Sequence, residues 1–393
     1  MHPARQTQQS SVPMHSIDYP LLLAVVALVG LGLVMVFSTT YLLTMDEPYH
    51  FLLRQLAATA LGVGVLLVLV RSDYHYWRRF SLLVMGVAVV LLIAVLFVGE
   101  GQGSKRWLFA TSVQPAEIAK LALVLYIADW LSPKGEELKD LVYGLLPFGL
   151  LVGIVAGLIL LEPDFGTALL LIMIAVSTFF IAGADVLQLM TGSVFSGGAL
   201  FLLAIISPYH RARFDKFWNP FQNMNGTGWQ ISQALIALAS GGLLGKGLGN
   251  GVRKYEWVPL AHTDTIFAII GEELGLVGCL LVIGLFALLA YRGFRIALQA
   301  PDRFGSLLAT GVTCWLVLQA LVNIGGITAS LPFTGVPLPF ISYGGSSMAT
   351  CLVGAGLLLS VSRQTQRLGG LNRAALDLGG WDGGPRLPRS RRR

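Results

Sequence analysis

The residues most able to carry out chemistry lie where an ionisable stretch, residues 250–263, runs into an apolar helix signal that begins near Asp264. A carboxylate at that junction is either the N-cap of the helix or a reactive group that faces a cavity, and the two roles are compatible. Glu272 and Glu273 follow about 12 Å deeper, at a rise of about 1.5 Å per residue, and therefore do not share a site with Asp264. We expect them to join neighbouring helices through polar contacts.

A second polar group marks the start of a helix predicted over residues 115–131. Arg106 and Gln114 precede this helix. Glu117 and Lys120 are three residues apart on it, so they share one face of the helix and can pair. A lysine within an apolar helix is costly enough to indicate a functional site, whereas a purely structural ion pair is the alternative.

Two further polar segments follow along the chain. Asp164 stands just before a helix predicted over residues 166–183, and capping of that helix is favoured over catalysis. Basic and aromatic residues alternate over residues 207–222, with Arg213 among them. This alternation suits either anchoring at the membrane interface or contact with an anionic head group or diphosphate.

The last polar segment, residues 323–347, is too rich in proline and glycine to form a regular span. Irregular backbone at membrane depth is tolerated only where it is buried in protein or lines a water-filled cavity. The N–H and hydroxyl groups around Ser342 and Ser346 are therefore expected to form a nest for an anion.

Composition places all these groups in a membrane protein. Of the 393 residues, 55% are hydrophobic and only 12% are charged, and the mean hydropathy is +0.71. A soluble domain of this length needs far more charge on its surface. The chain is predicted to be an all-α, polytopic integral membrane protein with about ten transmembrane helices, since runs of about 20 apolar residues mark spans. The predicted spans are 20–40, 51–70, 80–98, 115–131, 141–161, 166–183, 186–206, 265–290, 305–325 and 346–362.

Charge sets the predicted orientation. Lysine and arginine are concentrated on the side of the membrane that carries the termini, apart from one long loop whose charges count little. Both termini are therefore expected in the cytoplasm. Only a few residues separate the predicted spans 166–183 and 186–206. Merging these two spans would reverse the predicted orientation of every span that follows them.

A single domain over residues 20–362 is predicted, after a short cytoplasmic segment, 1–19. Its large outer loop, 207–263, contains residues 229–244, which suit an interfacial or re-entrant helix better than a span. The tail, 363–393, carries a charge equal to the net charge of the whole chain, +6. Its Gly-, Pro- and Arg-rich composition predicts a disordered cytoplasmic tail that contacts anionic membrane lipids, with topology anchoring as the simpler role.

Several common kinds of site are excluded by their patterns. The stretch around Lys246 resembles a phosphate loop, but Ser240 and Gly247 stand where a Walker motif requires Gly and Ser or Thr. No HExxH and no paired CxxC occurs, and the cysteines lie in apolar runs. No nucleic-acid-binding signature accompanies the basic tail, so no nucleic acid is expected as a partner.

Taken together, the polar segments resemble the SEDS family (shape, elongation, division and sporulation), typified by FtsW and RodA. The resemblance runs through nearly every segment from Leu21 to Arg363. The motifs that carry it are Ser104-Lys105-Arg106-Trp107-Leu108, Gln114-Pro115-Ala116-Glu117-Ile118-Ala119-Lys120, Pro163-Asp164-Phe165-Gly166-Thr167, Phe217-Trp218-Asn219-Pro220, Ala261-His262-Thr263-Asp264, Gly271-Glu272-Glu273-Leu274-Gly275 and residues 339–347.

The resemblance implies a ten-helix bacterial inner-membrane peptidoglycan glycosyltransferase. Such an enzyme polymerises lipid II, an undecaprenyl diphosphate-linked disaccharide peptide, and works with a class B penicillin-binding transpeptidase and other divisome membrane proteins. The essential carboxylate of the family falls on Asp264, and further important polar residues fall on Arg106, Glu117, Lys120 and Asp164. The sequence departs from many members at two positions, where Leu260 replaces Glu and Thr265 replaces Phe.

The chemistry of this reaction assigns roles to the candidates. Joining lipid-linked sugars requires an acceptor hydroxyl to lose its proton while a polyprenyl diphosphate leaves the anomeric carbon. Asp264 is expected to be the general base. The charge on the diphosphate would be stabilised by basic groups, and a divalent cation such as Mg²⁺ or Mn²⁺ would share that task, although the chain shows no dedicated metal site. The basic candidates are Arg106, Lys120, Arg213 and Lys254.

Other functions stay open at this point. A lipid II flippase or ion-coupled transporter would use Glu272 and Glu273 as intramembrane acids, and a purely structural divisome scaffold would need no reactive group. Within the family, residues 247–250 and 269–273 are closer to the division or sporulation type than to the elongation type. A division role predicts a location at the septum.

Overall fold

The chain is described by a computed structural model, which covers residues 17–41, 49–99, 106–108, 113–192, 194, 197–198, 228–255 and 257–378, with side chains as far as residue 364. Helices dominate these residues, and the only β-type pairing among them is an isolated bridge between Leu108 and Val113. The protein is therefore all-α in the part of the chain described, as predicted.

The first half of the chain forms helices that begin and end close to the predicted limits. Asp18 caps the first helix by accepting a hydrogen bond from the N–H of Leu21, and Pro20 occupies its first turn, where a missing N–H costs nothing. These elements are α1 (Tyr19–Thr40), α2 (His50–Arg71), α3 (Tyr74–Arg78), α4 (Ser81–Val98), α5 (Pro115–Leu131), the short helical segments η1 (Glu136–Lys139) and η2 (Leu141–Leu145), α6 (Leu146–Leu161) and α7 (Phe165–Ile181).

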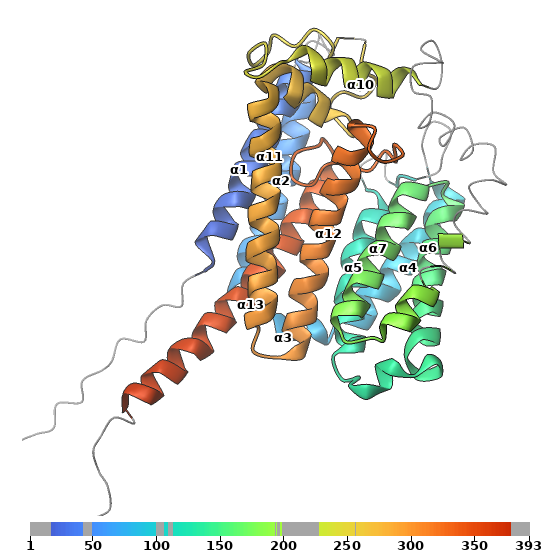
Figure 1. Ribbon diagram of the computed structural model, residues 1–393, viewed down its shortest axis with the longest axis vertical. Coiled ribbons are helices and arrows are strands. Elements are labelled where there is room, and N and C mark those ends of the chain that lie inside the picture. Colours follow the sequence, from blue (N-terminus) through green and yellow to red (C-terminus); the bar gives the residue numbers. More distant parts are fainter. Residues whose placement is uncertain are drawn as a thin grey trace, which may run out of the picture.

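The second half of the chain forms the central helices of the bundle and a helix that lies across one end of it. Its elements are α10 (Trp229–Ser240), α11 (Ile266–Gln299), α12 (Arg303–Ile327) and α13 (Gly345–Leu378). Figure 1 shows α10 lying across one end of the bundle, beside the start of α11, as expected for an interfacial helix. The start of α1 and the end of α13 leave the bundle on the opposite side.

Helix α12 is the central element. It packs against α11 and α13 on one side and against α5 and α7 on the other, so it joins the two groups of helices visible in Figure 1. Its Trp315 is fully buried, and 78% of the residues in its most apolar 18-residue stretch are buried inside the protein. Residues from α12 are therefore well placed to support a site between the two groups.

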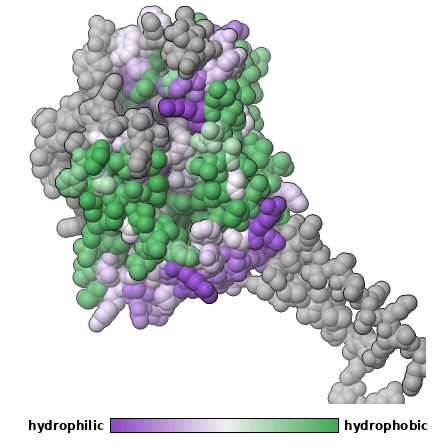
Figure 2. Space-filling view, turned by 180° about the vertical axis from the view of Figure 1, so that it is seen from behind, coloured by the Kyte–Doolittle hydropathy of each residue, from purple (hydrophilic) through white to green (hydrophobic). Residues whose placement is uncertain are grey.

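The protein is a multi-pass membrane protein. Within the described residues, seven helices are long and apolar enough to cross a membrane, and α7 is a shorter apolar helix. Figure 2 shows a broad apolar band on one face of the molecule, with hydrophilic residues above and below it. Each predicted span except 186–206 coincides with a helix. Of 186–206, residues 186–192 are helical, and residues 193, 195–196 and 199–206 lie outside the described part.

Three predicted boundaries need correction. Helix α11 begins at Ile266 with Thr265 at its N-cap, so Asp264 does not cap it. The same helix is broken at Gly275, which has a φ of 67°. Helix α13 continues to Leu378 and so includes the first part of the tail that was predicted to be disordered, whereas residues 379–393 lie outside the described part.

Candidate active site

The centre of the site is an irregular segment, residues 328–344, which connects α12 to α13 and is called the strap here. Two side chains of α12, one turn apart, hold it from below. Gln319 Nε2 donates to the carbonyl of Pro337 at 2.9 Å, and Asn323 Nδ2 donates to the carbonyl of Val336 at 2.8 Å. The second part of the strap, from Val336 to Ser342, is thus mostly buried and its backbone has hydrogen-bond partners, as expected for irregular backbone inside a membrane protein, whereas residues such as Leu331 and Gly335 are exposed.

Asp264 lies against this strap. The amide of Asn323 also donates to the carbonyl of Asp264 at 2.7 Å, so one α12 side chain joins Asp264 to the strap. Asp264 Oδ2 lies 3.4 Å from the position that a Cβ of Gly335 would occupy. Asp264 is only part-buried, and its Oδ1 accepts a hydrogen bond from the Thr263 hydroxyl at 3.0 Å. Its backbone is fixed while its carboxylate keeps access to solvent.

The residue two positions earlier, His262, is held in an aromatic cluster. Its ring lies 5.1 Å from that of Phe51 in α2 and 5.4 Å from that of Tyr343 in the strap. The N–H of Tyr343 donates to the His262 carbonyl at 2.8 Å. Burial lowers the pKa of His262 to about 4, so the ring is neutral near pH 7 and serves as packing for the Asp264 segment.

The predicted anion nest around Ser342 and Ser346 is used within the protein instead. The Ser342 hydroxyl donates to the Thr263 carbonyl at 2.6 Å and accepts from the N–H of Leu338 at 2.8 Å. Ser346 Oγ accepts from the N–H of Gln114 at 3.3 Å. These residues position the Asp264 segment and join α5 to α13, and their role as anion ligands stays a prediction.

Glu117 and Lys120 form the predicted ion pair, at 2.8 Å, with both side chains fully buried. Lys120 Nζ also donates to Gln319 Oε1 at 2.7 Å, and Gln319 in turn holds the strap. The ammonium lies 5.6 Å from the centre of the Trp315 ring. Lys120 therefore reaches Asp264 through α12 and the strap, and its charge is already compensated by Glu117.

Arg106, Glu162 and Asp164 gather at the start of α7. Asp164 is the predicted cap: it accepts from the Thr167 N–H at 3.1 Å and from the Thr167 hydroxyl at 3.0 Å. Arg106 donates from Nε to the Glu162 carbonyl at 3.0 Å and from its guanidinium to the Pro163 carbonyl. Among the described residues, no carboxylate forms a salt bridge with Arg106.

Glu162 was not a predicted site residue, yet it is the most unusual acid of the group. Its side chain is 1% exposed, and neither carboxyl oxygen has a hydrogen-bond partner within the described residues. Burial, followed by the negative charge of Asp164, raises the pKa of Glu162 to about 8, with Arg106 opposing the shift. The sequence shows only an acid before a proline and gives no sign of this isolation.

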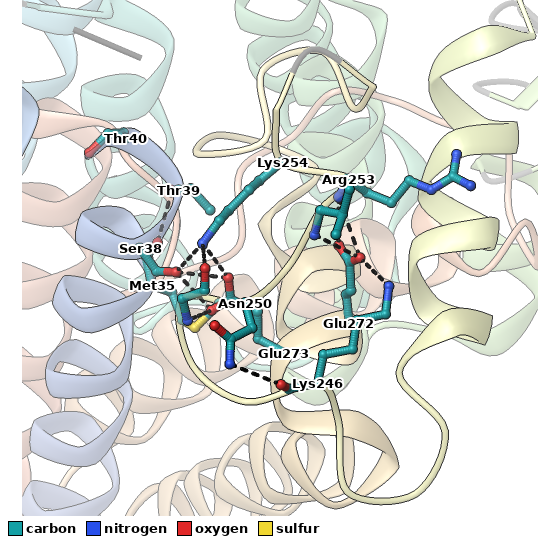
Figure 3. Close-up of polar contacts among 12 residues, drawn as sticks. Met35, Ser38, Thr39, Thr40, Lys246, Asn250, Arg253, Lys254, Glu272 and Glu273 are labelled. Carbon is teal, nitrogen blue, oxygen red and sulfur yellow. Dashed lines mark hydrogen bonds and ion pairs between the residues drawn. The ribbon is translucent and has the colours of Figure 1, made fainter. Parts of the chain in front are cut away.

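Lys254 belongs to a different structure, formed by residues 241–254 and called the clasp here. Its ammonium lies 2.7 Å from Glu273 Oε1 and donates to Ser38 Oγ of α1 at 2.9 Å and to the Gly249 carbonyl at 2.8 Å. Figure 3 shows these groups converging between α1 and α11. All of these partners are internal, so the predicted contact of Lys254 with a diphosphate gains no support here.

Glu272 points to the other side of the clasp (Figure 3). Its carboxylate pairs with Lys246 Nζ at 2.6 Å and accepts from the N–H groups of Val252 and Arg253, each at 3.1 Å. The glycine-rich stretch that failed as a phosphate loop is therefore a support for α11. Glu272 and Glu273 both have internal partners at the end of the bundle that carries α10, so these two acids no longer favour an ion-coupled transporter.

The clasp also replaces hydrogen bonds that α11 loses at Gly275. In an unbroken helix the N–H groups of Leu276 and Val277 would donate to the carbonyls of Glu272 and Glu273. Here these N–H groups donate to residues 242 and 243 at 2.9 and 3.2 Å, and both carbonyls accept from residues 246 and 247 at 3.0 Å. The break in the helix leaves none of these four backbone groups unpaired.

Two further predictions concern Arg213 and a divalent metal ion. Arg213 lies outside the described residues. Among the described residues, no group of three or more His, Cys, Asp or Glu side chains is arranged to hold a metal ion.

Comparison with known proteins gives consistent matches over most of the chain. A family model that covers FtsW, RodA and SpoVE, described as "Cell cycle protein", matches residues 19–367. A probable peptidoglycan glycosyltransferase FtsW of Thioalkalivibrio sulfidiphilus is 41% identical, over 90% of this chain and 92% of that protein. Stage V sporulation protein E of Bacillus subtilis is 36% identical, over 89% of this chain and 98% of that protein.

Solved structures agree with this assignment. One chain of a peptidoglycan synthase complex, described as coordinating polymerization and crosslinking, matches with a TM-score of 0.74 and 31% identity, over 89% of this chain and 98% of that chain. The rod shape determining protein RodA of Thermus thermophilus matches with a TM-score of 0.66 and 30% identity, over 89% and 97%. The fold and the sequence thus lead to one conclusion: the chain belongs to the FtsW/RodA/SpoVE family, the SEDS proteins.

Proposed function

We propose that this peptidoglycan glycosyltransferase polymerises lipid II with Asp264 as its general base. One observation carries the proposal. Glu117, Asp164, Glu272 and Glu273 are buried within the protein, whereas Asp264 is part-buried and its backbone is fixed to α12. A base must be held firmly and still meet a substrate hydroxyl, and Asp264 meets both conditions.

The reaction joins two lipid-linked sugars. Asp264 takes the proton from the acceptor hydroxyl. The oxygen of that hydroxyl attacks the anomeric carbon of the donor, and the bond from this carbon to the diphosphate breaks. The charge that develops on the leaving diphosphate calls for fixed donors. Arg106 is the described basic side chain that suits this task, because it is part-exposed and its hydrogen bonds within the described residues go to backbone carbonyls.

Lys120 and Glu117 are positioning residues in this scheme. Both are buried and paired, and Lys120 holds Gln319, which donates to the strap. Any Mg²⁺ or Mn²⁺ that takes part is proposed to arrive with the diphosphate rather than on a cluster of protein carboxylates. Chelation by EDTA during the polymerisation assay tests that point.

The cellular role follows the named relatives. The FtsW relatives favour a role in septal wall synthesis during division, with an elongation role like that of RodA as the alternative. The match to a complex that couples polymerization and crosslinking favours a class B penicillin-binding transpeptidase as partner. We propose that both termini are cytoplasmic, in keeping with the start of α1 and the end of α13, which lie on the side of the bundle away from α10. Imaging of a tagged copy at the septum or the lateral wall tests the cellular location.

The decisive test is polymerisation of lipid II by purified protein. Asp264→Ala is expected to lower the rate by about 10²-fold to 10⁴-fold, the usual contribution of a general base. Asp185→Ala, at an exposed aspartate, is the matched control. Full polymer yield from Asp264→Ala, in protein with an unchanged melting temperature, would remove Asp264 from this role.

A further inference from the structure

Glu162 is the one acid of the α7 end whose chemistry the scheme above leaves unused. Its carboxyl group is buried beyond the end of α6, and both of its oxygens lack partners within the described residues. An ionised carboxylate in such surroundings is strongly disfavoured, because neither water nor a donor compensates its charge. The neutral acid is therefore the form that this environment favours, and a neutral acid carries an O–H donor.

The immediate neighbours of this group decide what it binds. The nearby charged groups that act on it are Arg106, whose guanidinium donates to the carbonyls of Glu162 and Pro163, and Asp164, which caps α7. A guanidinium has five N–H donors, so Arg106 keeps some for a ligand. The guanidinium offers only donors, and a neutral carboxyl adds an O–H donor to its acceptor oxygen, so the two groups together suit an anion better than a metal cation.

The place of this pair in the fold connects it to Asp264. Gly166, in the first turn of α7, lies so close to the strap that a Cβ there would be 2.7 Å from the Thr334 carbonyl oxygen. The next strap residue, Gly335, is the one beside Asp264 Oδ2. The start of α7 and the Asp264 segment therefore lie against the same short stretch of the strap.

We propose that Glu162 is a further substrate-binding residue, whose neutral carboxyl donates a hydrogen bond to the diphosphate of the lipid-linked sugar beside Arg106. The proposal rests on the proposed function, since the diphosphate is the leaving group of that reaction. Glu162 supplies a donor without adding a second positive charge. Its O–H also fixes the diphosphate relative to the strap, and thus relative to Asp264.

This arrangement has a pH dependence with a definite sign. The pKa of Glu162 is raised to about 8 by burial and by Asp164. A donor that must be protonated acts below its pKa and is lost as the pH rises through it. Binding of the diphosphate should therefore weaken above about pH 8. Glutamine has the same shape and keeps a donor at every pH, so Glu162→Gln should remove this dependence.

The test measures binding of undecaprenyl diphosphate in detergent micelles, in an Asp264→Ala background so that no catalysis is needed. At about pH 7, Glu162→Ala is expected to weaken binding roughly 10-fold to 100-fold, as for loss of a hydrogen bond to a charged group. Glu162→Gln should restore most of that loss. At about pH 9.5 Glu162→Gln should bind more tightly than the protein that retains Glu162.

Several results would overturn the proposal. Unchanged binding by Glu162→Ala would show that the carboxyl does not meet the diphosphate. A loss with Glu162→Gln as large as with Glu162→Ala would show that an ionised carboxylate is required. If EDTA lowers binding by the protein that retains Glu162 but leaves binding by Glu162→Ala unchanged, a cation held by Glu162 is the partner of the carboxylate. Glu137→Gln, at an exposed glutamate of η1, is the control. Because binding is measured without turnover, this outcome is independent of whether Asp264 proves to be the base.

Discussion

Two sets of buried carboxylates, in the clasp region and before α7, differ in the hydrogen-bond partners they have. Glu272 and Glu273 are each met by a lysine and by backbone N–H groups of the clasp. Glu162 is equally buried and has no hydrogen-bond partner among the described residues. Burial alone therefore does not separate structural acids from functional ones, whereas the list of partners does.

The difference assigns separate roles to the two regions. The clasp uses its charges to fix a loop to a broken helix and to α1, so its acids should matter for stability. Glu162 and Asp264 lie against elements that are already held by other contacts, so they should matter for substrate. Substitutions in the two regions are expected to separate the melting temperature from the activity.

The largest expected loss of stability follows from breaking the Lys254–Glu273 pair. Glu273→Ala leaves the ammonium of Lys254 buried with only Ser38 and the Gly249 carbonyl as partners. Removing one member of a buried ion pair costs about 3–5 kcal/mol of folding free energy. Thermal unfolding in detergent measures the effect.

A double substitution sharpens this result. Replacing the buried pair with apolar residues, as in Glu273→Leu combined with Lys254→Met, removes both charges together and should recover much of the lost stability. If Glu273→Ala leaves the melting temperature unchanged, the clasp does not hold α11, and the contrast between the two regions fails.

The next effect tests the backbone of the clasp. Gly245 has a φ of +78°, and a Cβ there would overlap the Glu273 carbonyl. Gly245→Ala is therefore expected to lose about 1–3 kcal/mol from the strained conformation, with a further loss from the overlap. The melting temperature of the purified protein reports this change.

A matched glycine in the same helix system provides the comparison. Gly284 in α11 has no atom within 4 Å of an added Cβ. Gly284→Ala should leave stability unchanged or raise it by up to about 1 kcal/mol, since alanine favours helix over glycine. Equal losses from Gly245→Ala and Gly284→Ala would mean that the close approach of the clasp to α11 has no special cost.

The regular helices were predictable because their signals are local. Apolar runs of membrane length gave the helix limits to within a few residues, except at the ends of α11 and α13, which continue to Gln299 and Leu378 instead of 290 and 362. The cap at Asp164 and the pair Glu117–Lys120 follow from spacings of three residues. The resemblance to the SEDS family added the order of these parts. Local rules suffice where the partners lie within one turn of the chain.

The contacts of the clasp were not predictable in the same way. Lys254 contacts Glu273, which is 19 positions away in the sequence, and Ser38 of α1, which is 216 positions away. No spacing rule relates such residues. Gly275 looked like an ordinary glycine of a transmembrane helix, although it marks the break that the clasp fills. Glu162 could not be distinguished because its isolation is a property of the folded surroundings.

The smallest expected effect comes from the exposed half of the clasp. Lys246 pairs with Glu272, but its side chain is 34% exposed, and Glu272 keeps the N–H groups of Val252 and Arg253 as partners. Lys246→Met should therefore cost only about 1 kcal/mol, since solvent screens a partly exposed pair. Thermal unfolding of Lys246→Met and Glu273→Ala under the same conditions compares the two losses of stability. A loss from Lys246→Met equal to that from Glu273→Ala would show that the two halves of the clasp act as one charged unit, and that exposure does not set their contributions.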